Sequence, residues 1–171
     1  MSHPLVLGLF STPADATAAA NRLHAMGVQR SALSVVARSH EEQGELAEAM
    51  DATPGAEIED SRRASRLGEL SAVLIGAAAT VMPGVAPHIA IGPLAAEFGE
   101  AAGHLAGSVS GILERAGVET KVAEKWEHAV ADGAILLGVH EAGSRVEAIC
   151  EALAACGARE VAVAEWPDST P

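Results

Sequence analysis

Short apolar runs and longer helical patterns alternate at the start of the chain. Residues 4–10 form an apolar run that fits a strand buried on both faces, and residues 33–37 form a second one. Ser11 or Thr12 can cap a helix between them, and Gly27 can end that helix as a left-handed cap. The helix keeps small and aliphatic residues at helical spacing, at Ala16, Ala19, Ala20 and Leu23. The pattern predicts a strand–helix–strand unit.

The same unit returns at an offset of 130 residues, without a gap. The opening strand 7–9 returns as 137–139, and the helix end 25–27 returns as 155–157. Self-similarity of this kind indicates that one structural unit is used twice. The second copy predicts a strand, a helix ended by Gly157 and a last strand, over residues 134–140, 144–156 and 161–164.

A repeated strand–helix–strand unit predicts an α+β fold, the ferredoxin-like sandwich. We expect a four-stranded antiparallel sheet with the first strands of the two units in the centre and both helices on one face. The expected organisation is a split domain, a linker that is acidic and then basic, a long Gly/Ala-rich helical insertion and a tail: residues 1–39 with 134–166, 40–66, 67–133 and 167–171.

The insertion contains a long uncharged run over residues 70–96. Pro83 breaks it, so the longest helix before the break is 67–82, and a transmembrane span needs about 20 continuous apolar residues. We therefore expect a helical hairpin that turns at 83–87. Shallow contact with a membrane surface, helped by three basic residues, is the alternative: Arg62, Arg63 and Arg66.

Small residues recur every four positions along both arms of this hairpin. On a helix that spacing places them in one row, which allows two backbones to approach closely. We expect a helix contact, within the chain or between chains, through Gly68, Ala72 and Gly76 on the first arm and Gly99, Gly103, Gly107 and Gly111 on the second.

Composition narrows the possible partners. Apolar residues make up 49% of the 171, but aromatics only 2%, so the core buries little area per residue and we expect self-association, with a dimer as the first guess. The net charge of −12 argues against nucleic acid, whose phosphates require a concentrated basic surface. No export signal is visible at the first residues, which favours a cytoplasmic protein.

Candidate chemistry is sparse. No serine lies in a nucleophile motif, and the glycine series does not end as a phosphate loop does. Carboxylates and imidazoles at helical spacing could bind zinc or iron, namely Glu97, Glu100 and His104 on one helix and Glu124 and His128 on the next. Solvated helix faces explain these pairs more simply, so we assign no metal, cofactor or catalytic residue. We interpret Trp126 as a core anchor whose indole N–H reaches a carbonyl, and His88 and His140 as ordinary polar residues at a turn and a strand end.

Several short motifs occur in order along most of the chain, at residues 6–27, 33–37, 82–85, 90–94, 117–119, 123–127 and 133–139. In this order they resemble the YflT-like heat-induced and general stress proteins of bacteria, a family of unknown function whose members are often labelled predicted membrane proteins. The family usually has tyrosine where this chain has Trp126. The resemblance implies a stress-associated bacterial protein and supplies no catalytic residues.

Three classes of function follow from these observations. The first is a non-enzymatic stress-associated protein that acts by self-association or binding. The second is a sensor that binds a small ligand or a metal on the sheet. The third is a peripheral membrane protein that uses the apolar hairpin.

Overall fold

The computed structural model describes residues 2–38, 79–82, 88–91, 93–94, 108–140 and 143–167. The predicted linker, residues 40–66, lies outside these ranges, and so do residues 67–78, 83–87, 92 and 95–107 of the predicted helical insertion.

The first unit has the elements that its sequence predicts. Strand β1 (Ser2–Phe10) leads into helix α1 (Pro13–Ala25), a single 3₁₀ turn η1 (Arg30–Ala32) and strand β2 (Leu33–Arg38). The Thr12 side chain caps α1 by accepting the backbone N–H of Asp15 at 3.2 Å. Gly27 follows the helix with φ of 85°, in the left-handed region that favours glycine.

The second unit repeats this order with small differences in its boundaries. Strand β5 (Ile135–His140) is followed by the 3₁₀ turn η4 (Gly143–Arg145), helix α7 (Val146–Ala155) and strand β6 (Glu160–Pro167). The predicted helix start at residue 144 is thus a 3₁₀ turn. Strand β6 is longer than predicted and includes Pro167, which we had placed in the tail.

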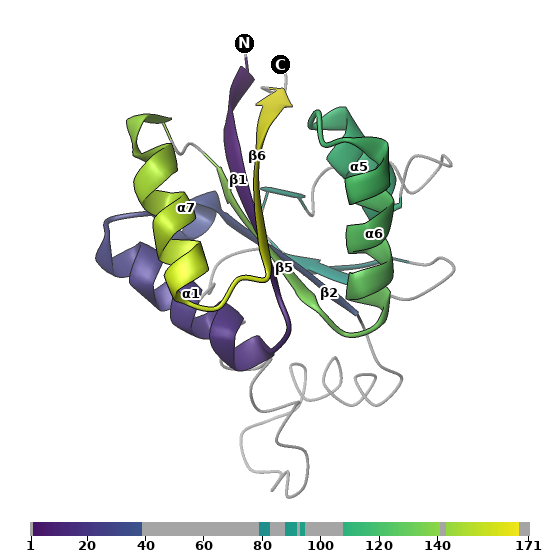
Figure 1. Ribbon diagram of the computed structural model, residues 1–171, viewed down its shortest axis with the longest axis horizontal. Helices are drawn as coiled ribbons and strands as arrows, with labels where there is room; N and C mark the ends of the chain where they lie inside the picture. The colour runs from purple at the N-terminus through teal and green to yellow at the C-terminus, as the bar shows by residue number, and fades with distance from the viewer. Residues whose placement is uncertain are drawn as a thin grey trace, which may run out of the picture.

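Two further strands are β3 (Ala79–Met82) and β4 (His88–Ile91). The sheet has the order β3-β4-β2-β5-β1-β6, and every pairing in it is antiparallel. Strands β1 and β5, the first strands of the two units, pair with each other from Leu5 opposite His140 to Phe10 opposite Ile135. Helices α1 and α7 lie together on one side of the sheet (Figure 1). The antiparallel pairing, the inner position of β1 and β5 among the four strands of the two units, and the two-helix face are confirmed. The sheet has six strands where we expected four, because β3 and β4 are added beside β2.

The segment around the predicted hairpin turn differs from expectation. Strand β3 (Ala79–Met82) and strand β4 (His88–Ile91) form an antiparallel β-hairpin, and β4 pairs with the outer side of β2. The predicted helix over 67–82 is therefore wrong at its last four residues, and His88 begins a strand where we expected a turn. The backbone groups on the outer side of β2 would be unpaired without β4. Pairing with β4 gives them hydrogen-bond partners, and this favours a strand over a helix in this segment.

The opposite face of the sheet is covered by helices α5 (Val109–Arg115) and α6 (Thr120–Ala131), so helices flank the sheet on both sides (Figure 1). Trp126 of α6 is 1% exposed within the core on this side, together with Leu5 and Leu7 of β1. Residues 108–133 thus belong to the same core as the two units, although we had assigned them to the insertion.

The two copies of the repeat do not correspond residue by residue at this offset. The offset of 130 holds in the helices, where Ala19 and Leu23 of α1 and Ile149 and Leu153 of α7 all enter the core below these helices. It fails in the first strands. Phe10 lies in that same core, whereas His140, its counterpart at the offset, lies on the opposite face. Because a shift of one residue exchanges the two faces of a strand, β5 is shifted by one position relative to β1.

Candidate functional site

A buried polar cluster lies at the end of β5, on the face that α5 and α6 cover. His140 is 3% exposed, and its Nε2 is 2.9 Å from the Oγ of Ser34 on the neighbouring strand β2. The ring of Trp166 on β6 meets the His140 ring edge-on at 5.3 Å between centroids, and the His3 ring of β1 lies 5.8 Å from it. Four of the six strands thus contribute to the cluster or adjoin it.

The protonation of His140 is determined by its burial. Desolvation, and then the nearby charge of His3, lower the pKa of His140 from 6.5 to about 4. The imidazole is therefore neutral at physiological pH. Its Nδ1 is buried and has no hydrogen-bond partner among the described residues.

The geometry of the Ser34–His140 pair is that of a structural link. Ser34 is completely buried, and its Oγ accepts the backbone N–H of Leu94 at 3.0 Å. A nucleophilic serine needs access to a substrate carbonyl as well as a nearby base, and the burial of Ser34 removes that access. The pair connects β2, β5 and the segment at Leu94. Sequence reasoning missed it, although Ser34 is the one polar residue in the apolar run 33–37.

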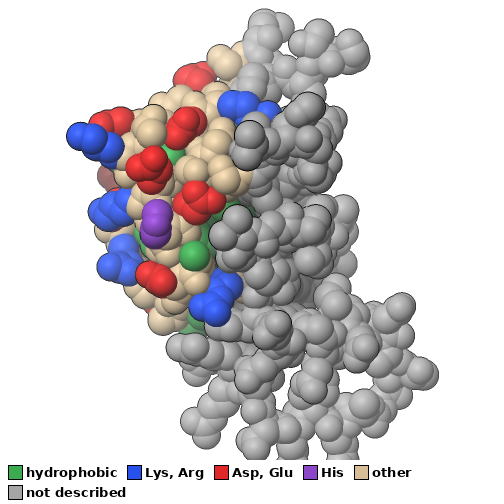
Figure 2. Space-filling model, turned by 90° about the vertical axis from the view of Figure 1, so that its right-hand side faces the viewer, with side chains coloured by type: hydrophobic (Ala, Val, Ile, Leu, Met, Phe, Trp, Pro, Cys, Tyr) green, Lys and Arg blue, Asp and Glu red, His purple; other side chains and the backbone are tan. Residues whose placement is uncertain are grey.

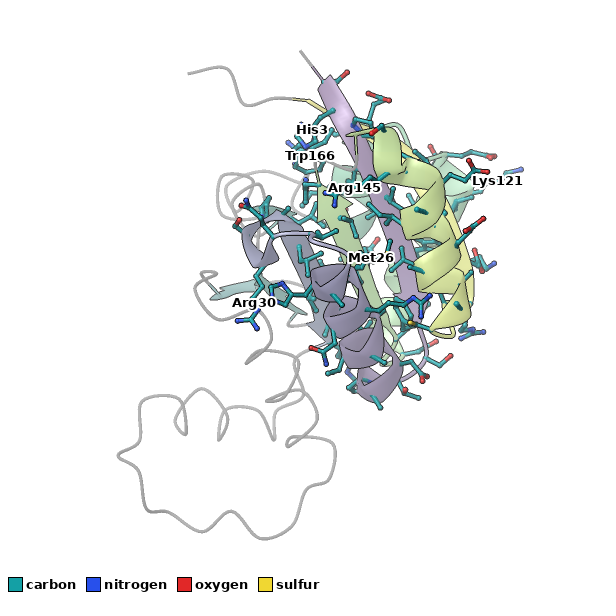
Figure 3. All side chains as sticks on the ribbon, turned by 90° about the vertical axis from the view of Figure 1, so that its left-hand side faces the viewer. His3, Met26, Arg30, Lys121, Arg145 and Trp166 are labelled. Carbon is teal, nitrogen blue, oxygen red and sulfur yellow. The ribbon has the colours of Figure 1, made fainter. Side chains whose placement is uncertain are left out.

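A small pocket of about 130 Å³ opens on the other side of the same sheet end. Backbone and side chains of the α1–β2 connection form one wall, and Arg145 and Ile149 form the other. The Nη1 of Arg145 donates to the carbonyl oxygen of Met26 at 3.1 Å, which caps the C-terminus of α1. Figure 3 shows Arg145 near the end of the sheet that carries His3 and Trp166. A guanidinium has five N–H donors, so Arg145 keeps donors for an anionic group.

The outer side of β6 together with the preceding residue, residues 159–165, is here called the β6 edge. Strand β6 is last in the sheet order, and within the described part of the chain no strand pairs with its outer side. Figure 1 shows the strand in front, between α7 and α6. Val163 lies on it with 54% of its surface exposed, the one large hydrophobic residue so exposed among those described.

Part of the β6 edge is already occupied. The backbone N–H of Glu165 donates to the carbonyl oxygen of Ala116, in the turn between α5 and α6, at 2.9 Å. It therefore points away from β1. Successive residues of a strand direct their backbone groups alternately to its two sides, so those of Val161 and Val163 also point outward. On the β6 edge, Val161 and Val163 thus present both apolar side chains and outward backbone groups.

The metal-ligand hypothesis gains no support from the residues that can be located. Glu97, Glu100 and His104 lie outside the described residues. On α6 the Nδ1 of His128 donates to the backbone carbonyl of Glu124 at 2.8 Å, and both side chains are exposed. Acidic and basic side chains are mixed on the described surface of this side of the molecule (Figure 2). No group of three potential ligands occurs among the described residues.

The predicted glycine row is interrupted where it can be followed. Ser108 is the N-cap of α5, with extended backbone angles, so Gly111 belongs to a helix that begins after Gly107. A continuous helix through all four glycines is therefore wrong at this point. The other predicted packing residues lie outside the described ranges and their contact stays a prediction: Gly68, Ala72, Gly76, Gly99, Gly103 and Gly107.

Trp126 anchors its helix as expected, but through a different partner. Its indole N–H donates to the Glu160 carboxylate at 2.9 Å, where we expected a carbonyl. Lys125 forms an ion pair with the other oxygen of that carboxylate. The hydrogen bonds from Lys125 and then Trp126 lower the pKa of Glu160. This arrangement fixes α6 to the beginning of β6.

Comparison of the chain with protein families, curated proteins and solved structures finds no match in any of the three. Among the described residues, no helix combines the length and apolar character needed to cross a bilayer. Statements about the function of this chain therefore rest on the geometry of its described residues.

Proposed function

We propose that this chain is a non-enzymatic, stress-associated protein of the cytoplasm that acts by self-association, with the β6 edge as the contact surface. The observation that supports self-association is the exposure of Val163 on an edge strand that retains outward backbone groups. Such an edge is a template for pairing with another strand. The burial of Ser34, the one serine found beside an imidazole in the described part, favours a role without catalysis.

We also propose that the scaffold is a ferredoxin-like sandwich with an added hairpin. The order β2-β5-β1-β6, with α1 and α7 on one face, supports this classification. In this arrangement β6 and β2 are the outer strands. Since β4 pairs with β2, β6 is the outer strand of the two units that stays available for a partner.

The mass of the protein in solution tests the proposal. We expect light scattering after size exclusion to give twice the chain mass for the wild type, and the mass of one chain for Val163→Glu. Ala18→Glu is the matched control, because Ala18 is exposed on α1 and the substitution adds the same charge. A monomeric wild type, or a Val163→Glu variant that keeps the wild-type mass, would contradict self-association through the β6 edge.

The stress association is tested separately in the cells that produce the protein. We expect its abundance to rise after heat or another general stress, in comparison with an unstressed culture. Unchanged abundance under all stresses tried would refute this part of the proposal and leave the assembly result intact.

The pocket at Arg145 favours a second function, the sensing of a small anionic ligand. Its volume of about 130 Å³ suits a carboxylate- or phosphate-sized group, and Arg145 offers planar donors that match such groups. Calorimetric titration with phosphate and with a small dicarboxylate tests it. Arg145→Ala should abolish binding, whereas Arg30→Ala, which removes an exposed arginine of η1, should not. Equal affinities in the two variants, or no binding by the wild type, would exclude this function.

A further inference from the structure

We infer that the partner of the β6 edge is the β6 edge of a second copy, paired antiparallel with Ala162 on the twofold axis. This inference rests on the proposed function and specifies its geometry. It follows from which backbone groups of β6 remain available, and from the side chains that the resulting pairing would place opposite one another.

Both ends of the β6 edge are closed to pairing. The N–H of Arg159 donates to the carbonyl oxygen of Leu9 at 2.7 Å, and that of Glu165 donates to Ala116. Pro167, at the end of the strand, has no N–H. The outward N–H groups that a second strand can use are therefore those of Val161 and Val163.

One twofold register satisfies both of these residues. If Ala162 faces Ala162 of the second copy, Val161 of each copy forms a hydrogen-bonded pair with Val163 of the other. Placing Val163 on the axis would instead require the N–H of Glu165, which is bonded to Ala116. Placing Val161 there would set Val163 opposite Arg159, whose N–H is directed to Leu9.

The side chains support the same register. Val161 and Val163 lie on the face of α1 and α7, where Val161 adjoins the core, so the two copies would join their valines into one apolar strip. Beyond these valines, on the same face and outside the hydrogen-bonded pairs, the register brings the Arg159 side chain of one copy toward the Glu165 side chain of the other, at both ends of the strip. Both side chains are exposed in the single chain. The edge is thus complementary to itself in shape and in charge.

Charge reversal on the full chain tests the register. Arg159→Glu and Glu165→Arg should each raise the dissociation constant of the dimer about tenfold, because each places like charges opposite one another twice. The double variant Arg159→Glu/Glu165→Arg should restore the wild-type constant. Sedimentation equilibrium measures all four proteins, and their thermal unfolding shows whether each variant is folded.

Disulfide trapping provides a second measurement. In this register the two Ala162 residues form a non-hydrogen-bonded pair with Cα atoms about 4.5 Å apart, a distance that a disulfide can span. Ala162→Cys should therefore give a covalent dimer on mild oxidation. Val163→Cys should give much less, and the wild type reports any contribution of Cys150 and Cys156.

The outcomes separate this inference from the proposed function. A monomeric wild type overturns both. A second set of results overturns the register alone. In it, Val163→Glu dissociates the dimer, neither charge reversal changes the dissociation constant, and oxidation traps Val163→Cys instead of Ala162→Cys. Loss of affinity in both single variants without recovery in the double variant also contradicts it.

Discussion

Acidification should destabilise the fold through His140. In the native state this imidazole has a pKa of about 4, whereas the unfolded chain has the ordinary value of 6.5. Between these two values the unfolded state binds a proton that the native state does not. Stability is therefore lost as the pH falls through this window, and the loss stops below the native pKa.

The size of the effect follows from the two pKa values. One pKa unit corresponds to about 1.4 kcal/mol, so the full loss is about 3 kcal/mol and about 2 kcal/mol of it has occurred at pH 5. This is a large part of the total stability of a typical domain, which is about 5–15 kcal/mol. The effect is large because His140 is 3% exposed and cannot recover hydration when it is charged.

Urea unfolding at pH 7 and at pH 5 measures this loss. Other groups also titrate in this range, so the informative quantity is the difference between the wild type and His140→Gln, which keeps a polar group for Ser34 but has no imidazole. We expect the wild type to lose about 2 kcal/mol more than His140→Gln. His128→Gln, which removes an exposed histidine, is the control and should behave as the wild type. Equal losses in the wild type and His140→Gln would refute the reasoning.

Four further substitutions test other contacts, each by urea unfolding against the wild type. Costs are given as the decrease in the free energy of unfolding. Ser34→Ala should cost about 1–3 kcal/mol, because it leaves the Leu94 N–H and the His140 ring without their partner. Gly27→Ala should cost about 1–2 kcal/mol, because its φ of 85° suits glycine alone, whereas Ala25→Gly nearby loses only helix propensity. Glu160→Gln should cost less than about 1 kcal/mol at pH 7 and progressively less as the pH falls, because the lowered pKa of Glu160 stabilises only the ionised form. Gly107→Leu should cost about 1–3 kcal/mol if the glycine contact exists, and Gly107→Ala far less; equal stability of both variants would contradict that contact.

The elements of the two units could be predicted because their signals are local. Helix periodicity, the cap at Thr12 and the left-handed Gly27 each depend on a few adjacent residues. The shift of β5 could not be predicted in the same way. Both faces of this strand are buried, so Leu136 and Leu137 are equally apolar and the sequence carries no alternation that would assign them to a face.

The candidate sites depend on contacts between distant residues. Ser34 and His140 are separated by 106 positions, and no local pattern indicates that they meet. In the uncharged run the sequence alone does not distinguish helix from strand. His88–Ile91 is a strand because it pairs with the outer side of β2, and Ala79–Met82 is a strand because it pairs with His88–Ile91. The last strand over 161–164 was predicted, but the availability of its outer side depends on Ala116, which contacts Glu165 from the layer of α5 and α6.

The pairing of β1 with β6 has a practical consequence for labelling the protein. Ser2 lies opposite Pro167, so the two ends of the described chain are neighbours (Figure 1). A donor dye at one end and an acceptor dye at the other would therefore give efficient energy transfer in the native state. Loss of the signal would report the separation of β6 from β1 in real time.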